Sequence, residues 1–96
     1  NSCHHVVVSW KPPKFPAYRI NVDGSYKATP GIAACGGLII DGNGNVKAWF
    51  HRKLIPCNAL LVELWGLKFG IHLAKDMNLY SVCLESDSLV AVHLVK

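Results

Sequence analysis

The sequence predicts an α/β domain with a mixed sheet, in the order strand, strand, strand, helix, strand, helix. Three observations predict it. Short apolar runs separated by Gly, Pro and Asn occupy much of residues 18–54, which is typical of strands joined by short links. Residues 58–77 carry apolar side chains at helical spacing. A further apolar run follows at residues 79–84, and a helix between two strands favours a right-handed crossover to a parallel strand.

The composition limits the class of protein. The chain has 96 residues, which is enough for one small domain. Apolar residues make up 51% of it and charged residues 17%, a balance that favours a packed core over disorder. The formal net charge of +4 fits a polyanionic partner, although many inert domains are mildly basic. No apolar run reaches the roughly 18 residues that a membrane span requires, so we expect no membrane partner.

The first 16 residues are interpreted as a proline-containing lead-in, and residues 17–96 as the domain. Residues 10–16 read WKPPKFP, and proline cannot continue a helix because it lacks the amide hydrogen. A polyproline-type linker is the simpler interpretation of this segment. A proline-rich ligand for another domain is the alternative.

Three strands are predicted before the helix. The first covers residues 18–23 and ends in Asp23, just before a glycine. Residues 25–34 contain Thr-Pro-Gly and are interpreted as a turn-rich link. The second strand covers residues 35–40 and the third residues 46–54.

The second and third strands are joined by Asp-Gly-Asn-Gly-Asn at residues 41–45, which predicts a tight reversal. The alternating oxygen side chains suggest a calcium loop. That interpretation fails, because Val46 stands where a glycine is needed and Arg52 where a glutamate is needed. Asp41 is therefore interpreted as a turn residue.

The long helix is expected at residues 58–77, with Asn58 as its N-cap. Glu63 projects from the middle of the apolar arc, where an unpaired carboxylate would be costly. A salt bridge to Arg19, or the helix dipole, would be a purely structural explanation. Two glycines of the same arc suggest that the helix backbone lies close to a sheet, namely Gly66 and Gly70.

A fourth strand is predicted at residues 79–84, followed by Glu-Ser-Asp-Ser. Ser86 or Asp87 is expected to cap a second helix that begins near Ser88. The sequence stops at Lys96 within this predicted helix, so we expect the chain to be shorter than its natural domain, that is, C-terminally truncated.

Four cysteines occur at positions 3, 35, 57 and 83, without a CxxC pair. No leader of the secretory type is present, so we expect reduced thiols that fill the core, in an intracellular, reducing compartment. Cys3, His4 and His5 could hold a soft metal, but the remaining ligands are missing from this cluster. None of the five histidines is assigned a role.

Three acidic residues stand where a sheet and a helix can converge. Asp23 ends the first predicted strand, Glu63 lies on the inner face of the helix, and Asp87 follows the fourth strand. Like charges are gathered in this way when a cation lies between them. Because the donors are carboxylate oxygens, the hard ions Mg²⁺ and Mn²⁺ are favoured.

These motifs together resemble the ribonuclease H family. The resemblance is carried by DGS at residues 23–25, Gly36-Gly37, DGNG at 41–44, VELW at 62–65 and ESDS at 85–88. The match extends from Trp10 onward and is strongest to the plant branch related to retroelement reverse-transcriptase polyproteins.

The resemblance implies a ribonuclease H-like fold with a five-stranded mixed sheet, and a site that cuts the RNA strand of RNA–DNA hybrids. It implies that Asp23, Glu63 and Asp87 are catalytic and hold two Mg²⁺ or Mn²⁺ ions together with the substrate. Gly24 and Ser25 match the positions where the family approaches the nucleic acid. The fourth carboxylate, the fifth strand and the closing helix of the family would lie beyond Lys96. Apolar residues replace polar ones just before the helix glutamate, at positions 59–61.

Two functions of different classes remain open. One is a metal-dependent endoribonuclease that acts on hybrids. The other is a catalytically degenerate module, derived from a retroelement, that binds nucleic acid or a protein partner. A gene fragment whose product barely folds is a third and weaker alternative. The sequence does not distinguish nucleus from cytoplasm, nor does it identify protein partners.

Overall fold

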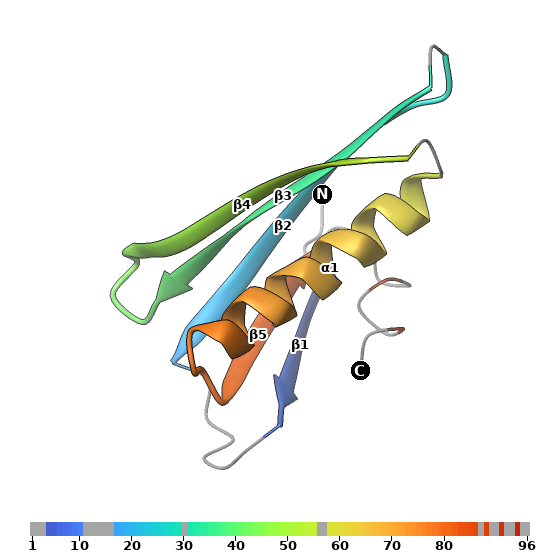
Figure 1. Cartoon of the computed structure of the whole chain (residues 1–96). Coiled ribbons are helices and arrows are strands. Elements are labelled where there is room, and N and C mark those ends of the chain that lie inside the picture. The colour runs from blue at the N-terminus through green and yellow to red at the C-terminus, as the bar shows by residue number, and fades with distance from the viewer. Residues whose placement is uncertain are drawn as a thin grey trace.

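The structure is a computed structural model that describes residues 4–10, 17–29, 31–55, 58–86, 88, 91 and 94. Within them, one helix packs on one face of a five-stranded sheet, which confirms the predicted mixed α/β class (Figure 1). The elements in chain order are β1 (His4–Ser9), β2 (Tyr18–Lys27), β3 (Ile32–Asp41), β4 (Val46–Leu54), α1 (Ala59–Asp76) and β5 (Ser81–Ser86).

The strand order across the sheet is β1-β5-β2-β3-β4. β2, β3 and β4 are antiparallel neighbours, as the short links between them predict. After β4, α1 carries the chain across the sheet to β5, which pairs with β2 in parallel from Tyr18↔Val82 to Asn21↔Glu85. The predicted crossover to a parallel strand is therefore present.

Some strand boundaries differ from the prediction. Asp23 does not end its strand, because β2 continues to Lys27, and Asp23 lies opposite Gly36 in the ladder with β3. The predicted link at residues 25–34 is mostly strand. Glycine disfavours strands by itself, but pairing with β3 over the whole length of β2 overrides that local preference. β5 is also shifted by two residues relative to the predicted range.

The lead-in contains a strand that the sequence patterns do not reveal. β1 pairs antiparallel with β5 and forms an edge of the sheet. Val6 and Val8 alternate along it and pack against the core, which explains why this segment joins the sheet. Residues 11–16, which include the predicted proline linker, lie outside the described residues.

Helix α1 begins as predicted, because the Asn58 side chain accepts a hydrogen bond from the Leu61 amide at 2.9 Å. Its glycines lie against the sheet. A Cβ on Gly66 would collide with Val22, and one on Gly70 would lie 2.6 Å from Ile20 Cγ2. The close approach of helix and sheet that these glycines predict is confirmed. The core between the two layers includes the fully buried side chains of Ile20, Ile39, Leu67 and Leu84.

The start of the last predicted helix is partly described. The Ala91 amide donates to Ser88 Oγ at 3.1 Å, an N-capping contact, and Ala91 and Leu94 are helical. The other residues of this predicted helix lie outside the described residues. None of the described helical segments has the length and apolar character needed to cross a membrane.

The reversal between β3 and β4 is organised by Asp41. One carboxylate oxygen accepts hydrogen bonds from the amides of Asn43 and Asn45, each at 2.9 Å, and the other lies 3.6 Å from Lys47 Nζ. The Asn45 amide, with help from the Asn43 amide and the Lys47 charge, holds the pKa of the Asp41 carboxyl below its usual value. The interpretation of Asp41 as a turn residue is confirmed.

This lowered pKa predicts a pH-dependent contribution to stability. The ionised carboxylate is favoured in the folded state, so its contribution should be complete above the usual pKa of aspartate. It should be lost as the pH falls through the lower folded pKa. We expect Asp41→Ala to reduce the free energy of unfolding at neutral pH, with a gap to wild type that narrows on acidification. Urea unfolding of both proteins at several pH values measures this gap, and a gap that widens in acid would contradict the account.

Candidate functional site

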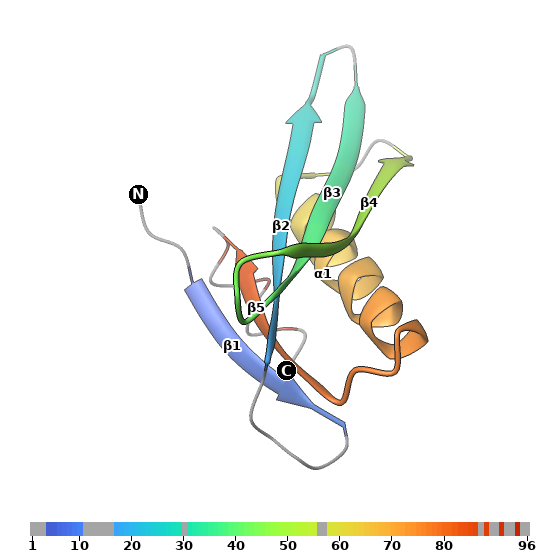
Figure 2. The same cartoon turned by 90° about the vertical axis from the view of Figure 1, so that its left-hand side faces the viewer.

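The two faces of the sheet differ. Ile20 and Val22 on β2 are buried beneath α1, whereas Arg19, Asn21 and Asp23 alternate with them and are exposed on the other face, here called the open face. Figure 2 shows the strands with α1 behind them. Asp23 therefore reaches a surface that is accessible to a large ligand.

A shallow hollow on the open face contains Asp23. Its lining includes Asn21 and Asp23 from β2, Gly36 from β3, and Trp49 and His51 from β4. A smaller hollow beside it includes Asp23, Gly24 and Ser25. Asp23, Gly24 and Ser25, all predicted site residues, thus line one continuous stretch of surface.

Glu63 lies on the helix face of the sheet, where a directed hydrogen-bond chain holds it. Ser86 Oγ donates to Glu63 Oε2 at 2.8 Å and accepts from the Ser88 amide at 3.1 Å. Ser86 is only 1% exposed, so its hydroxyl has little alternative to these partners. One carboxylate oxygen of Glu63 is thereby fixed at the end of β5.

The other oxygen of Glu63 lies against β2. A Cβ on Gly24 would come 2.7 Å from Glu63 Oε1 and 2.5 Å from Val62 Cγ1. Only glycine leaves room for the carboxylate at this point. Glu63 is therefore held between Gly24, which follows Asp23, and Ser86, which precedes Asp87.

The β2–β5 pairing ends before Asp23. β5 pairs with β2 only as far as Asn21, and its described residues end at Ser86. Beyond Asn21, no strand among the described residues covers this edge of β2. Asp23 and Glu63 both adjoin this edge, but from opposite faces of the sheet, and neither hollow that contains Asp23 is lined by Glu63. Asp87 lies outside the described residues, so its position is not part of this geometry.

Arg19, the cation that the sequence offered as a structural partner for Glu63, lies on the open face. Its Nη1 is 3.6 Å from Glu85 Oε2. Glu85 is buried at the β1–β5–β2 junction, with a relative exposure of 7%. The Arg19 charge is thus directed to a different carboxylate.

The sequence patterns did not single out Trp49 or His51. Both line the hollow with Asp23, and Trp49 is 70% exposed. The signal was present in the period of two that strands follow, because Trp49, His51 and Lys53 alternate along β4 and are all exposed. These three residues, here called the β4 stripe, combine an aromatic ring with positive charge on the open face.

The hydrogen bond between Ser86 and Glu63 gives a testable prediction. Ser86→Ala should lower the free energy of unfolding by roughly 1.5–3 kcal/mol, the usual loss for a hydrogen bond to a charged group. Chemical denaturation measures the change, with exposed Ser25→Ala as the matched control. Equal stability of the two variants would mean that the contact does not hold Glu63.

Comparisons with known proteins place the chain in a family. The family described as "Reverse transcriptase-like" matches residues 21–96. The chain is 32% identical over 90 residues to the Arabidopsis thaliana protein named "Putative ribonuclease H protein At1g65750". The aligned part is 94% of this chain and 14% of that protein, so the chain spans about one seventh of the length of its relative. No solved structure was found to match. The chain belongs to the Reverse transcriptase-like family, a plant retroelement-related branch of the ribonuclease H family.

Proposed function

We propose that the chain binds RNA–DNA hybrids and hydrolyses their RNA strand, with divalent ions held by Asp23, Glu63 and Asp87. One observation carries the proposal. The Glu63 carboxylate is fixed between Gly24 and Ser86, the sequence neighbours of the other two acids. Gly24 and Ser86, which are more than 60 positions apart in the sequence, thus both lie next to the Glu63 carboxylate.

The donor set fits a hard ion. All three acids offer carboxylate oxygens, the ligands that Mg²⁺ and Mn²⁺ prefer. The Glu63 carboxylate is oriented before any ion binds, because Ser86 donates to one oxygen and Gly24 limits the movement of the other. When bound, such ions lower the pKa of an attacking water and stabilise the departing 3′ oxygen.

Other residues would position the nucleic acid. In this proposal the Gly24 backbone and the exposed Ser25 hydroxyl contact the backbone of the hybrid next to Asp23. The β4 stripe would extend the contact across the open face, because lysines neutralise phosphates and an exposed indole stacks on a base or sugar. The formal charge of +4 favours the same partner.

The role of the stripe can be tested by binding. Trp49→Ala should weaken the binding of a hybrid by roughly 5- to 150-fold, which corresponds to the loss of one stacking contact of about 1–3 kcal/mol. Trp65→Ala is the matched control, because Trp65 is 45% exposed but belongs to α1. Fluorescence anisotropy with a labelled hybrid, without divalent ion, measures both. Equal losses would contradict an interface on the open face.

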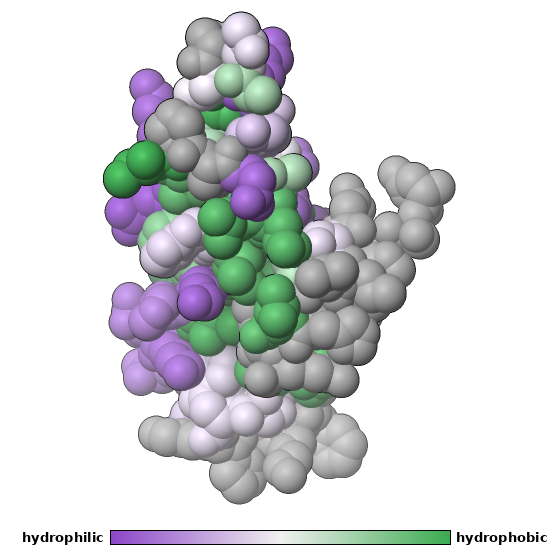
Figure 3. Space-filling model, turned by 90° about the vertical axis from the view of Figure 1, so that its right-hand side faces the viewer, coloured by the Kyte–Doolittle hydropathy of each residue, from purple (hydrophilic) through white to green (hydrophobic). Residues whose placement is uncertain are grey.

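A second candidate function is a module that binds nucleic acid without cutting it. Ala59, Leu60 and Leu61 are exposed in the first turn of α1, where the family resemblance implies polar contacts to the hybrid. Figure 3, viewed from the side on which α1 begins, shows apolar residues gathered over the middle of this face. Such a surface gives fewer hydrogen bonds to a substrate and favours the non-cleaving alternative.

Incubation of the purified chain with a labelled RNA–DNA hybrid separates the two functions. The proposed enzyme should shorten the RNA strand in the presence of Mg²⁺ or Mn²⁺, and a chelator should abolish the reaction. An RNA–RNA duplex is the control for strand selectivity. Binding without cleavage in both metals would favour the module, and cleavage that survives the chelator would contradict the proposed chemistry.

A further inference from the structure

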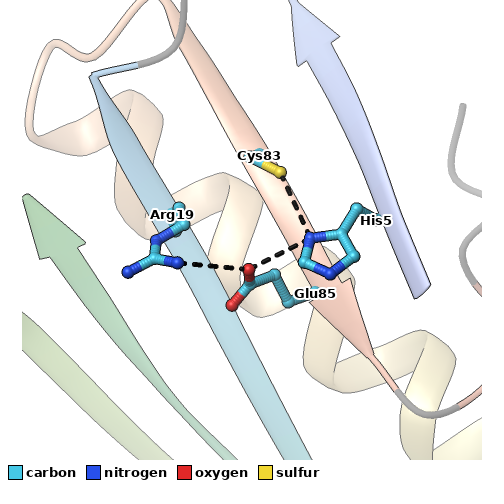
Figure 4. A network of polar contacts seen from close by, with 4 residues as sticks. All are labelled: His5, Arg19, Cys83 and Glu85. Atoms are coloured by element: carbon cyan, nitrogen blue, oxygen red, sulfur yellow. Dashed lines mark hydrogen bonds and ion pairs between the residues drawn. The ribbon is translucent and has the colours of Figure 1, made fainter. Parts of the chain in front are cut away.

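Three side chains of different chemistry meet on the open face where β1 pairs with β5 (Figure 4). His5 Nδ1 lies 3.1 Å from Glu85 Oε2 and 3.9 Å from Cys83 Sγ. The three potential ligand atoms all lie within 4.8 Å of one another. They offer one imidazole nitrogen, one sulfur and one carboxylate oxygen.

The strand register brings these residues together. His5 is directly opposite Glu85 in the antiparallel ladder, and Cys83 precedes Glu85 by two residues, so both project from the same face of β5. All three positions are therefore fixed by strand backbone. The Glu85 side chain is 9% exposed, whereas that of His5 is 52% exposed. The group is thus anchored on one side and open to solvent on the other.

We propose that His5, Cys83 and Glu85 form a zinc site on the open face, separate from the carboxylate group around Glu63. A nitrogen, a sulfur and an oxygen donor suit Zn²⁺, whereas Mg²⁺ is bound through oxygen. Zinc–ligand bonds of about 2.0–2.3 Å place tetrahedral ligand atoms roughly 3.3–3.7 Å apart. The 3.1 Å and 3.9 Å separations from His5 Nδ1 bracket that range, and Cys83 Sγ lies within 4.8 Å of the Glu85 oxygen, so side-chain movements of up to about 1 Å would bring all three atoms into place.

The site offers three protein ligands, which leaves the fourth tetrahedral position to water or an external ligand. Binding converts the Cys83 thiol to a thiolate and releases a proton. Arg19 opposes binding, because its guanidinium lies 3.6 Å from the same Glu85 oxygen and must yield it to the metal. The Arg19 side chain is 53% exposed, so this competing ion pair is weak.

Zinc at this position would link the edge strand β1 to β5. β1 is hydrogen-bonded to β5 alone in the described sheet, and the proposed ligands lie one on β1 and two on β5. A ligand that binds only the folded state stabilises it by mass action. We therefore expect Zn²⁺ to raise the melting temperature and to slow hydrogen exchange of the β1 amides.

The test uses the purified 96-residue chain with Zn²⁺, and with Co²⁺ as a spectroscopic substitute. We expect one ion per chain and a thiolate-to-cobalt charge-transfer band. Cys83→Ser should abolish the band, and His5→Ala or Glu85→Gln should weaken Zn²⁺ binding by at least about 100-fold, because loss of an outer-shell partner alone costs about 10- to 100-fold. His72→Ala, on the exposed side of α1, is the matched control. Unchanged affinity in His5→Ala would overturn the proposal.

Three more variants test whether this site is distinct from the groups near it. Cys3→Ser should retain the cobalt band, and a band that disappears in Cys3→Ser but survives in Cys83→Ser would overturn the proposal. Arg19→Gln should bind Zn²⁺ more tightly than wild type, because the competing cation is removed, and weaker binding would contradict the role given to Arg19. Asp23→Asn should bind Zn²⁺ as wild type does. The proposed zinc site and the proposed catalytic metal site can therefore be refuted independently of each other.

Discussion

Asp23→Asn is expected to abolish cleavage of the RNA strand without destabilising the fold. The substitution removes a charged metal ligand but keeps the shape of the side chain, so activity should fall by more than about 100-fold. Asp23 is exposed, and exposed substitutions usually change stability by less than about 0.5 kcal/mol. Relief of repulsion between acids should leave the melting temperature equal to or higher than that of wild type.

Cleavage of a labelled hybrid and thermal unfolding are measured on the same protein preparations. Asp76→Asn is the matched control, because Asp76 is exposed in the last turn of α1, away from the first turns that carry Glu63. A large drop in melting temperature for Asp23→Asn would indicate a structural aspartate. Cleavage that persists at the wild-type rate would remove Asp23 from the proposed metal site.

Gly24→Ala is expected to damage stability and metal binding together. The added Cβ would lie 2.5 Å from Val62 Cγ1 and 2.7 Å from Glu63 Oε1, so the Glu63 carboxylate must leave its position and either the Val62 side chain or the first turns of α1 must shift. Overpacking of this kind typically costs about 1–3 kcal/mol. In a domain of this size that corresponds to a fall in melting temperature of roughly 4–8 °C for each kcal/mol.

Gly42→Ala is the matched control for this prediction, because its Cβ would meet only the Ala17 carbonyl at 3.5 Å, an ordinary contact. Calorimetry gives the melting temperatures, and Mn²⁺ titration gives the effect on the carboxylates. If Gly24→Ala were as stable as Gly42→Ala, the close contact between β2 and Glu63 would be wrong.

Much of the fold could be predicted because local signals agree with the tertiary structure. Asn58 caps α1 in the predicted place, and Asp41 organises the predicted reversal. Gly66 and Gly70 lie on the apolar arc of α1, and their lack of side chains there correctly indicated close packing on the sheet. In each case the information lies within a few residues of the element.

The remaining features depend on contacts between distant residues. β1 pairs with residues about 80 positions away, and the run Val6-Val7-Val8 is too short to identify a strand beside a proline-rich segment. β2 extends past Gly24 because β3 pairs with it there, which local preferences oppose. Cys35 fills the core as predicted, whereas Cys83 lies on the open face beside His5. Cys3 and Cys57 lie outside the described residues.

The candidate site, like the fold, could be predicted from the sequence only in part. The sequence pointed to Glu63 because a carboxylate among apolar helix residues is costly unless a partner compensates its charge. Its contacts with Gly24 and Ser86, however, exist only in the folded chain. Trp49 and His51 were missed because aromatic and histidine residues on strands have many uses. Their alternation indicates a binding surface only when the structure shows that Asp23 lies on the same face.

The central claim is that one divalent ion site joins Asp23 and Glu63 across the edge of β2. The most direct measurement is Mn²⁺ titration of the ¹⁵N-labelled chain, carrying His5→Ala to disable the proposed zinc site, followed by paramagnetic broadening in NMR spectra. The account predicts broadening centred on the amides of Asp23, Gly24, Glu63 and Ser86, lost together in Asp23→Asn. Separate broadening around Asp23 and Glu63 at different Mn²⁺ concentrations, or broadening that avoids both, would contradict it.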